Sequence, residues 1–162
     1  MLAVSSDRKF AQYHGCARLE YRPQTENSML TKGTHHVSLT ISDLDAARQF
    51  YGELLGLPEI VRPEMGIRGT WYQAGSVQLH LIEPPGEMDA PKAEGNGSPI
   101  ANHIAFEVED YGATKARLEE AGLEVLGLGD VAGQMFVRDP HGNTIEFIQP
   151  GGQVGTVDGR RV

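Results

Sequence analysis

The chain has 162 residues, of which 40% are hydrophobic and 22% are charged; these values are typical of a folded protein with one domain or two small fused modules. Its formal net charge of −8 argues against a nucleic-acid partner, because such a partner requires a basic face, and against an anionic membrane surface. No apolar run reaches the roughly 20 residues that span a bilayer, and a single cysteine, Cys16, suits a reducing compartment. We therefore expect a cytoplasmic protein without a membrane partner.

The two ends of the chain differ from its middle. Residues 1–30 sustain no period of two or of 3.6 residues, so they are predicted to form a flexible N-terminal arm. Residues 151–162 are Gly-rich and are predicted to form a flexible C-terminal tail. The folded domain is expected to cover residues 31–150.

The first half of this domain predicts a strand, a helix and three strands. HVSLTIS (residues 36–42) alternates apolar and polar residues, which is typical of a half-buried strand. Ser42 or Asp43 is placed to cap a helix that Gly56 ends. That helix carries one apolar stripe, Ala47, Phe50, Tyr51, Leu54 and Leu55. Three strands follow at residues 57–63, 69–75 and 76–83.

The second half predicts the same order of elements. A strand at 102–110 leads into a helix at 111–122, and strands follow at 123–129, 133–139 and 143–149. The turn Asp139–Asn143 contains Pro140 and Gly142, which favour a tight reversal of the chain. A connector rich in Pro and Gly, residues 84–100, separates the halves. We predict an α+β fold of two β-α-β-β-β modules, residues 34–84 and 100–150.

The spacing of polar residues repeats between the two modules. His36 precedes Asp43 by 7 residues (43 − 36), and His103 precedes Asp110 by 7 (110 − 103). His36 and His80 are 44 residues apart (80 − 36), and His103 and Glu146 are 43 apart (146 − 103). Each module therefore places one candidate ligand on its first strand and another on its last strand.

These four residues are the candidate metal ligands. Alternation along the last strands puts His80 beside Ile82 and Glu146 beside Ile148 on one face, where an isolated polar group is unfavourable unless it has a partner. Three imidazoles and one carboxylate suit Zn²⁺, Fe²⁺, Ni²⁺, Co²⁺ or Mn²⁺ better than Ca²⁺. We assign His14 and His141 to surface positions, and we expect one of Trp71 and Tyr72 to face the site.

Four segments together resemble the vicinal oxygen chelate superfamily, also called the glyoxalase, bleomycin-resistance and dioxygenase superfamily. They are HHVSLTISDLDAARQFYGELLGL, LHLIE, NHIAFEVED and DPHGNTIEF, and the resemblance extends from about His35 to Gln149. It implies an open, eight-stranded, barrel-like mixed sheet around a metal, and a homodimer. It also implies that the ligands are His36 (rather than His35), His80, His103 and Glu146.

The resemblance implies an enzyme that chelates a small oxygenated substrate on its metal and stabilises an enolate-type intermediate, as a lyase, isomerase or epimerase. Glu146 is the first candidate for the catalytic base and His80 is the second. Similar members carry Glu or Gln where this chain has His80. Arg62 and Arg68 are assigned to solvated loop positions, with contact to an anionic substrate as the alternative.

Two other functions remain open at this point. The first is an extradiol ring-cleaving dioxygenase that uses Fe(II) on His36, His103 and Glu146. The second is a thiol transferase or a drug-sequestering resistance protein of the same fold. The fold does not choose among these functions.

Overall fold

The computed structural model describes residues 31–86, 99–151, 156–157 and 160–161. The predicted N-terminal arm, including His14 and Cys16, and most of the predicted connector lie outside these residues. Residues Gly33–Val162 form one compact unit, distinct from Met1–Lys32. In the part of the chain that the structure describes, no helix has both the length and the apolar character needed to cross a membrane.

The first module has the predicted order of elements: β1 (His36–Thr40), α1 (Leu44–Ala47), η1 (Arg48–Leu54), β2 (Glu59–Ile60), β3 (Arg68–Ala74) and β4 (Val77–Glu83). α1 and η1 form one continuous helix that widens along its length, since the N–H of Leu55 bonds to the carbonyl of Phe50 five residues back, at 3.0 Å. Asp43 is the N-cap, and the backbone N–H groups of Ala46 and Asp45 that bond to its carboxylate lower its pKa. Gly56 follows the helix with φ of 74°, the left-handed conformation expected of a terminating glycine.

The second module repeats this order as β5 (His103–Glu107), α2 (Tyr111–Glu120), β6 (Leu126–Gly127), β7 (Gln134–Arg138) and β8 (Thr144–Ile148). Asp110 caps α2 by accepting a hydrogen bond from the N–H of Ala113 at 2.8 Å. Within the predicted C-terminal tail, β9 (Thr156–Val157) pairs with β10 (Arg160–Arg161) in a short antiparallel ladder.

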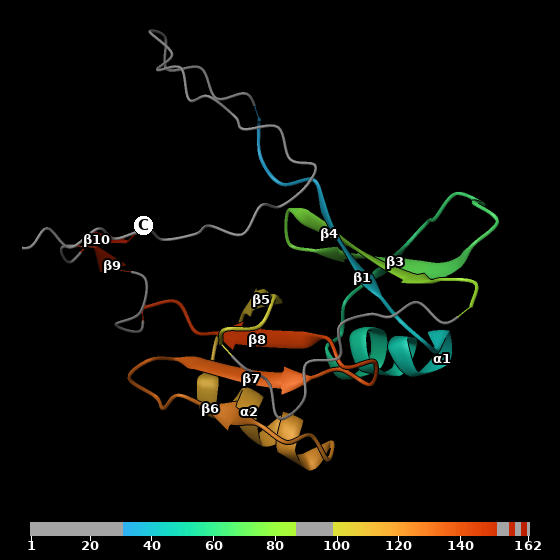
Figure 1. Ribbon diagram of the computed structural model, residues 1–162. Coiled ribbons are helices and arrows are strands. Elements are labelled where there is room, and N and C mark those ends of the chain that lie inside the picture. Colours follow the sequence, from blue (N-terminus) through green and yellow to red (C-terminus); the bar gives the residue numbers. More distant parts are fainter. Residues whose placement is uncertain (1–30, 87–98, 152–155, 158–159, 162) are drawn as a thin grey trace, which may run out of the picture. The chain divides into compact units, whose positions relative to one another are not determined.

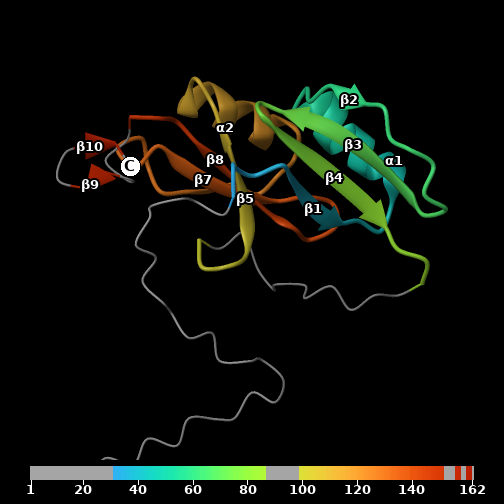
Figure 2. The same cartoon turned by 90° about the horizontal axis from the view of Figure 1, so that it is seen from above.

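The strands of each module form a four-stranded mixed sheet, in the orders β1-β4-β3-β2 and β5-β8-β7-β6 (Figures 1 and 2). In both sheets the first strand runs parallel to the last strand and the other neighbours are antiparallel. The predicted α+β fold and its internal repeat are therefore confirmed. Among the described strands, no hydrogen-bonded pair joins the two modules' sheets.

One face of each sheet is covered by helix. Leu79 and Leu81 of β4 and Ile145 and Phe147 of β8 are buried in a single hydrophobic core. The predicted helical stripe packs into the same core, where Ala47, Phe50 and Tyr51 are buried and Leu54 and Leu55 are partly buried. Because side chains alternate along a strand, the intervening residues lie on the opposite face of each sheet, which we call the site face.

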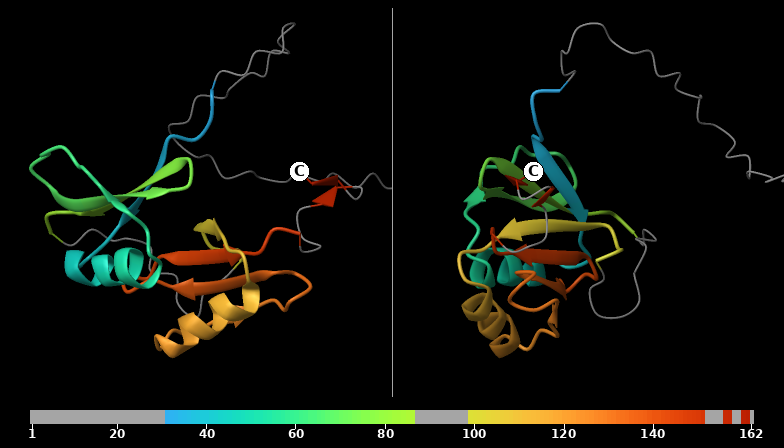
Figure 3. Two further views of the ribbon diagram at one scale, coloured as in Figure 1. Left: turned by 180° about the vertical axis from the view of Figure 1, so that it is seen from behind. Right: turned by 90° about the vertical axis from the view of Figure 1, so that its left-hand side faces the viewer.

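The turn Asp139–Asn143 joins the second module to the first. The buried hydroxyl of Tyr51 donates to Asp139 Oδ2 at 2.8 Å, and burial together with the nearby charge of Asp139 raises the pKa of Tyr51, so the phenol remains a donor. Asn143 Nδ2 donates to the carbonyl of Thr40 at 3.0 Å, and the N–H of Ser42 donates to His141 Nδ1 at 3.2 Å. Figure 3 shows the helix of the first module beside this end of β7 and β8.

Candidate metal centre

Cross-strand register brings His36, His80 and Trp71 together on the site face of the first sheet. Ser38 of β1 pairs with His80 of β4, which in turn pairs with Trp71 of β3. The His80 ring stacks on Trp71, with ring centroids 3.9 Å apart and 4° between the planes, and on His36, with centroids 4.3 Å apart and 10° between the planes. Three flat rings thus form one continuous stack. Of the two aromatic candidates, Trp71 faces the site and Tyr72 lies in the core.

Gln78 fixes the tautomer of His80. His80 Nε2 lies 3.0 Å from Gln78 Oε1, and an amide oxygen only accepts, so Nε2 carries the hydrogen and Nδ1 retains its lone pair. Burial lowers the pKa of His80, and the neighbouring charges of His36, His35 and Arg62 lower it further. The neutral ring that results is the form able to bind a metal or to accept a proton.

His35 contacts His36 rather than His80. The two rings meet edge to face, with centroids 5.2 Å apart, and their Nδ1 atoms are 3.0 Å apart. His35 therefore meets the stack only at its end, through His36.

The second sheet carries the other two predicted ligands. His103 Nε2 lies 2.9 Å from Glu146 Oε2, and the edge of the His103 ring meets Phe136, with centroids 5.6 Å apart. Glu146 is 5% exposed, and its second oxygen, Oε1, is buried without a hydrogen-bond partner. A carboxylate oxygen buried in this way is unfavourable unless a cation or a donor reaches it.

The hydrogen bonds of His103 suit a metal ligand. Nδ1 lies 2.8 Å from the carbonyl of Ala101, so Nδ1 carries a hydrogen and Nε2 is left to face the carboxylate. Two lone pairs cannot face each other at this distance without a proton or a cation between them. Metal-bound histidines typically donate one ring N–H to a backbone carbonyl, as His103 does, and keep the other nitrogen for the ion. The donor set of this pair therefore fits a divalent ion.

The structure places the four predicted ligands in two pairs, one on each sheet. In the described part of the chain, no group of three or more His, Cys, Asp or Glu side chains is positioned to hold a metal ion. A metal lies close to the plane of an imidazole that binds it, and the planes of His36 and His80 are parallel and stacked. Both rings therefore bind one ion only if one of them rotates out of the stack. The four-ligand site remains a prediction.

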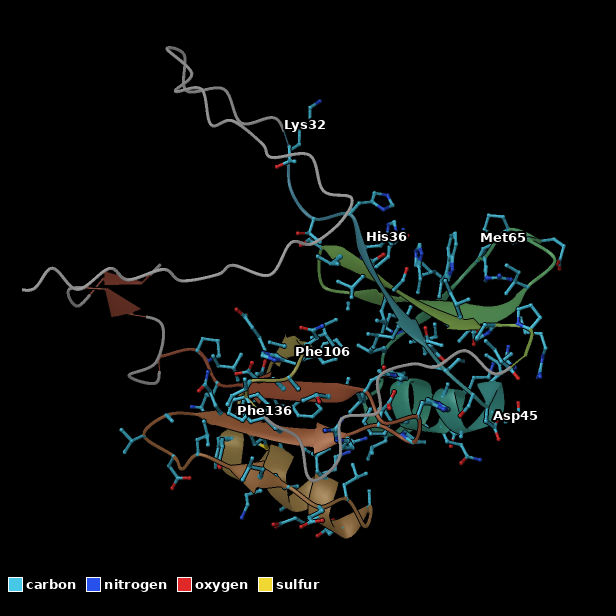
Figure 4. All side chains as sticks on the ribbon, in the orientation of Figure 1. Lys32, His36, Asp45, Met65, Phe106 and Phe136 are labelled. Carbon is cyan, nitrogen blue, oxygen red and sulfur yellow. The ribbon has the colours of Figure 1, made fainter. Side chains whose placement is uncertain are left out.

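Sequence reasoning missed Gln78 and Ala101, which orient the two histidines. Gln78 lies two residues before His80 on the same strand face, and Ala101 lies two residues before His103. The signal available was strand alternation, which places Gln78 beside His80. The contact of His103 with the carbonyl of Ala101 could not be predicted, because every residue type carries a backbone carbonyl. Figure 4 labels His36 on the first module's sheet and Phe136 on the second module's sheet.

The chain is similar to known proteins over most of its length. The model of the glyoxalase/bleomycin resistance protein/dioxygenase superfamily matches residues 33–147. Glyoxylase I 4 of Arabidopsis thaliana is 32% identical over 127 residues, 75% of this chain and 72% of the relative. Ethylmalonyl-CoA/methylmalonyl-CoA epimerase of Cereibacter sphaeroides is 32% identical over 122 residues, 72% of this chain and 87% of the relative.

A solved structure also resembles this one. A glyoxalase family protein from Bacillus anthracis superimposes with a TM-score of 0.61 at 29% identity, covering 75% of this chain and 98% of that one. The family match covers more than half of the chain, and the repeated modules and sheet topology are consistent with it. The chain therefore belongs to the glyoxalase/bleomycin resistance protein/dioxygenase superfamily.

Proposed function

We propose that the protein is a divalent-metal-dependent enzyme of the glyoxalase type, a lyase, isomerase or epimerase acting on a small oxygenated substrate. The observation that carries the proposal is the pair His103–Glu146. One nitrogen of His103 is committed to Ala101, the other faces the carboxylate at 2.9 Å, and Glu146 Oε1 is buried without a partner. The relatives named as a glyoxalase and as an epimerase support this class of reaction.

His36, His80, His103 and Glu146 are the residues that would hold the ion, which we expect to be Zn²⁺, Fe²⁺, Ni²⁺, Co²⁺ or Mn²⁺. Once bound there, the ion would act as a Lewis acid on two neighbouring substrate oxygens and stabilise the negative charge of an enolate. Glu146 is the first candidate to remove the substrate proton, because its unpartnered oxygen is buried and free to accept one. Neutral His80 is the second candidate, with the lone pair of Nδ1 available.

The proposal includes a homodimer. Each chain presents one pair of ligands on each of two separate sheets, and in the described part no three of them gather. A second copy, placed so that the site face of its second sheet meets the site face of the first, would bring four donors to one ion.

The test measures metal content and proton exchange on the same protein samples. Methylmalonyl-CoA and the hemithioacetal of methylglyoxal with glutathione serve as probes in deuterated water, and exchange at the carbon next to the carbonyl is followed by proton NMR. We expect exchange with at least one probe, without oxygen uptake. Glu146→Gln should slow this exchange about 100-fold or more, as expected when a general base is lost.

His36→Ala should lose most of its metal, while the adjacent His35→Ala, the matched control, should keep it. Equal metal content in wild type and His36→Ala would contradict the ligand assignment. Oxygen uptake with catechol, in place of proton exchange, would replace the proposed reaction with ring cleavage.

A further inference from the structure

A cavity of about 210 Å³ lies on the helix-covered face of the second sheet. Phe106 and Val108, at the end of β5, and Phe147 of β8 line it, and all three side chains pack in or against the hydrophobic core. Because side chains alternate along a strand, His103 and Glu146 point to the opposite, site face. Figure 4 labels Phe106 on β5. The cavity is therefore separate from the candidate metal centre.

Both modules contribute to the wall of this cavity. Leu54, Leu55 and Leu57, from the end of the first module's helix and the residues just after it, line the cavity together with Leu118 of α2. The three leucines of the first module are only partly buried, so their apolar surface is not fully covered by the rest of the chain. A molecule in the cavity would contact both modules at once and complete the burial of these leucines.

Two polar side chains of α2 complete the lining of the cavity. Thr114 and Arg117 both line it, and residues three apart are neighbours on one side of a helix. Arg117 is exposed, and a long cationic side chain keeps its charged end toward water, so Arg117 marks the mouth of the cavity. Neither side chain forms a hydrogen bond or an ion pair with a described residue, whereas the neighbouring Lys115 lies 3.3 Å from Glu119. The mouth thus offers one cation and one hydroxyl.

We infer that the cavity is a second ligand site, which binds a short-chain carboxylate. Its alkyl chain lies among the leucine and phenylalanine side chains, and its carboxylate accepts hydrogen bonds from Arg117 and Thr114. An apolar cavity of about 150 Å³ holds benzene, so a cavity of about 210 Å³ accepts a chain on the order of six carbons. The chain has a net charge of −8, which repels anions, so the preference for a carboxylate depends on the local charge of Arg117. The inference goes beyond the proposed function and does not depend on it.

Three small molecules separate the two halves of this recognition. Hexanoate has the chain and the carboxylate, 1-hexanol has the chain alone, and acetate has the carboxylate with almost no chain. Their dissociation constants are measured by calorimetry on the full-length protein as purified, with its metal content recorded. We expect hexanoate to bind about 10-fold or more tightly than either of the others, because burial of the chain and the charge of Arg117 both contribute. Hexanoate should also raise the melting temperature, since a ligand that binds only the folded state stabilises it.

Arg117→Gln should weaken hexanoate binding about 10-fold, as when a charge-assisted hydrogen bond is removed, and leave 1-hexanol binding unchanged. Lys115→Gln is the matched control: it removes one positive charge from the same helix and should leave hexanoate binding unchanged. Both substitutions replace side chains at or near the surface, so neither should prevent folding.

Val108→Phe tests the position of the ligand, because the larger side chain should fill the cavity and abolish hexanoate binding while circular dichroism shows that the fold persists. Four results would each overturn the inference: no saturable binding of hexanoate, equal affinities for hexanoate and acetate, equal affinities for hexanoate and 1-hexanol, or an equal loss in Arg117→Gln and Lys115→Gln. Undiminished binding to folded Val108→Phe would overturn it as well. None of these results bears on metal content or proton exchange, so the proposed function stands or fails separately.

Discussion

The imidazole of His80 lies between the rings of Trp71 and His36, and this position combines two effects on its charge. Stacking on an indole is favourable for a cation, whereas burial and the neighbouring charges oppose protonation. The pKa of His80 is lowered from its ordinary value of 6.5, with burial as the largest cause. The ring is consequently neutral at pH 7 and becomes charged only in more acidic solution.

Trp71 is the only tryptophan in the chain, and its fluorescence should report this protonation. A protonated imidazole quenches a stacked indole, so Trp71 emission should fall as the pH decreases from 8 to 4. The midpoint should lie below 6.5, because the His80 pKa is lowered. The measurement is a fluorescence titration of the metal-free protein, with circular dichroism as a check that the fold persists. His80→Gln should abolish the transition; a midpoint above 6.5, or a transition that survives in this variant, would contradict the stack.

Residue identity alone did not distinguish the surroundings of Arg62 and Arg68. Arg62 and Arg68 were both assigned to solvated positions, since arginine is mostly exposed in loops. The difference arises from Glu83, which pairs with Arg68 across β3 and β4. That pairing depends on which residues of β3 and β4 face each other, and the sequence predicts the two strands but not their exact register.

At the scale of elements, the turn between β7 and β8 holds the two modules together through a few buried polar contacts. Asp139 is 4% exposed. Its Oδ1 accepts hydrogen bonds from the backbone N–H groups of His141 and Asn143, at 2.9 and 2.7 Å. Its Oδ2 accepts from the Tyr51 hydroxyl and from Asn143 Nδ2, both at 2.8 Å. Such a carboxylate is stable in the interior only while these donors remain in place.

Tyr51→Phe should therefore destabilise the protein by about 1–3 kcal/mol, because it removes one of the two donors to the buried Asp139 Oδ2. The measurement is the free energy of unfolding from urea titrations. Tyr72→Phe is the matched control: the Tyr72 hydroxyl is buried without a hydrogen-bond partner of acceptable geometry, so its removal should leave stability unchanged or raise it. Equal losses in the two variants would show that ring packing, and not the bond to Asp139, determines the effect.

The order and type of the elements were predictable because each carries its own local signal. Asp43 and Gly56 mark the ends of the first helix, and Asp110 and Gly122 mark those of the second. The widening of η1 was not predictable, because the apolar stripe remains buried in either kind of helix. The strand predicted at residues 57–63 is reduced to Glu59–Ile60. The chain beyond Ile60 leaves the sheet, and Arg62 Nη2 donates to the carbonyl of Ile67 at 2.6 Å instead of continuing the ladder.

At the scale of the whole molecule, the repeat predicted which strand positions carry the candidate ligands but not the distances between the two modules. Register within a module follows from alternation and turn length, and it brings His36 to His80 and His103 to Glu146. The meeting of the two pairs depends on how one sheet packs against another, and no local pattern encodes that. If the two pairs of candidate ligands meet between two copies of the chain, only the dimer contains the complete site.

Mixing two disabled variants tests whether the site is shared. One variant carries His36→Ala and His80→Ala in the first module, and the other carries His103→Ala and Glu146→Ala in the second. Neither should bind metal alone. In a mixed dimer, the intact first module of one copy meets the intact second module of the other, so one complete site forms.

Random exchange of subunits should then restore about a quarter of the wild-type metal content. The metal content is measured by elemental analysis, after subunits with different affinity tags are shown to co-purify. Co-purification without metal recovery would mean that each site draws its ligands from a single chain, and a monomeric protein in sedimentation would exclude the shared site altogether.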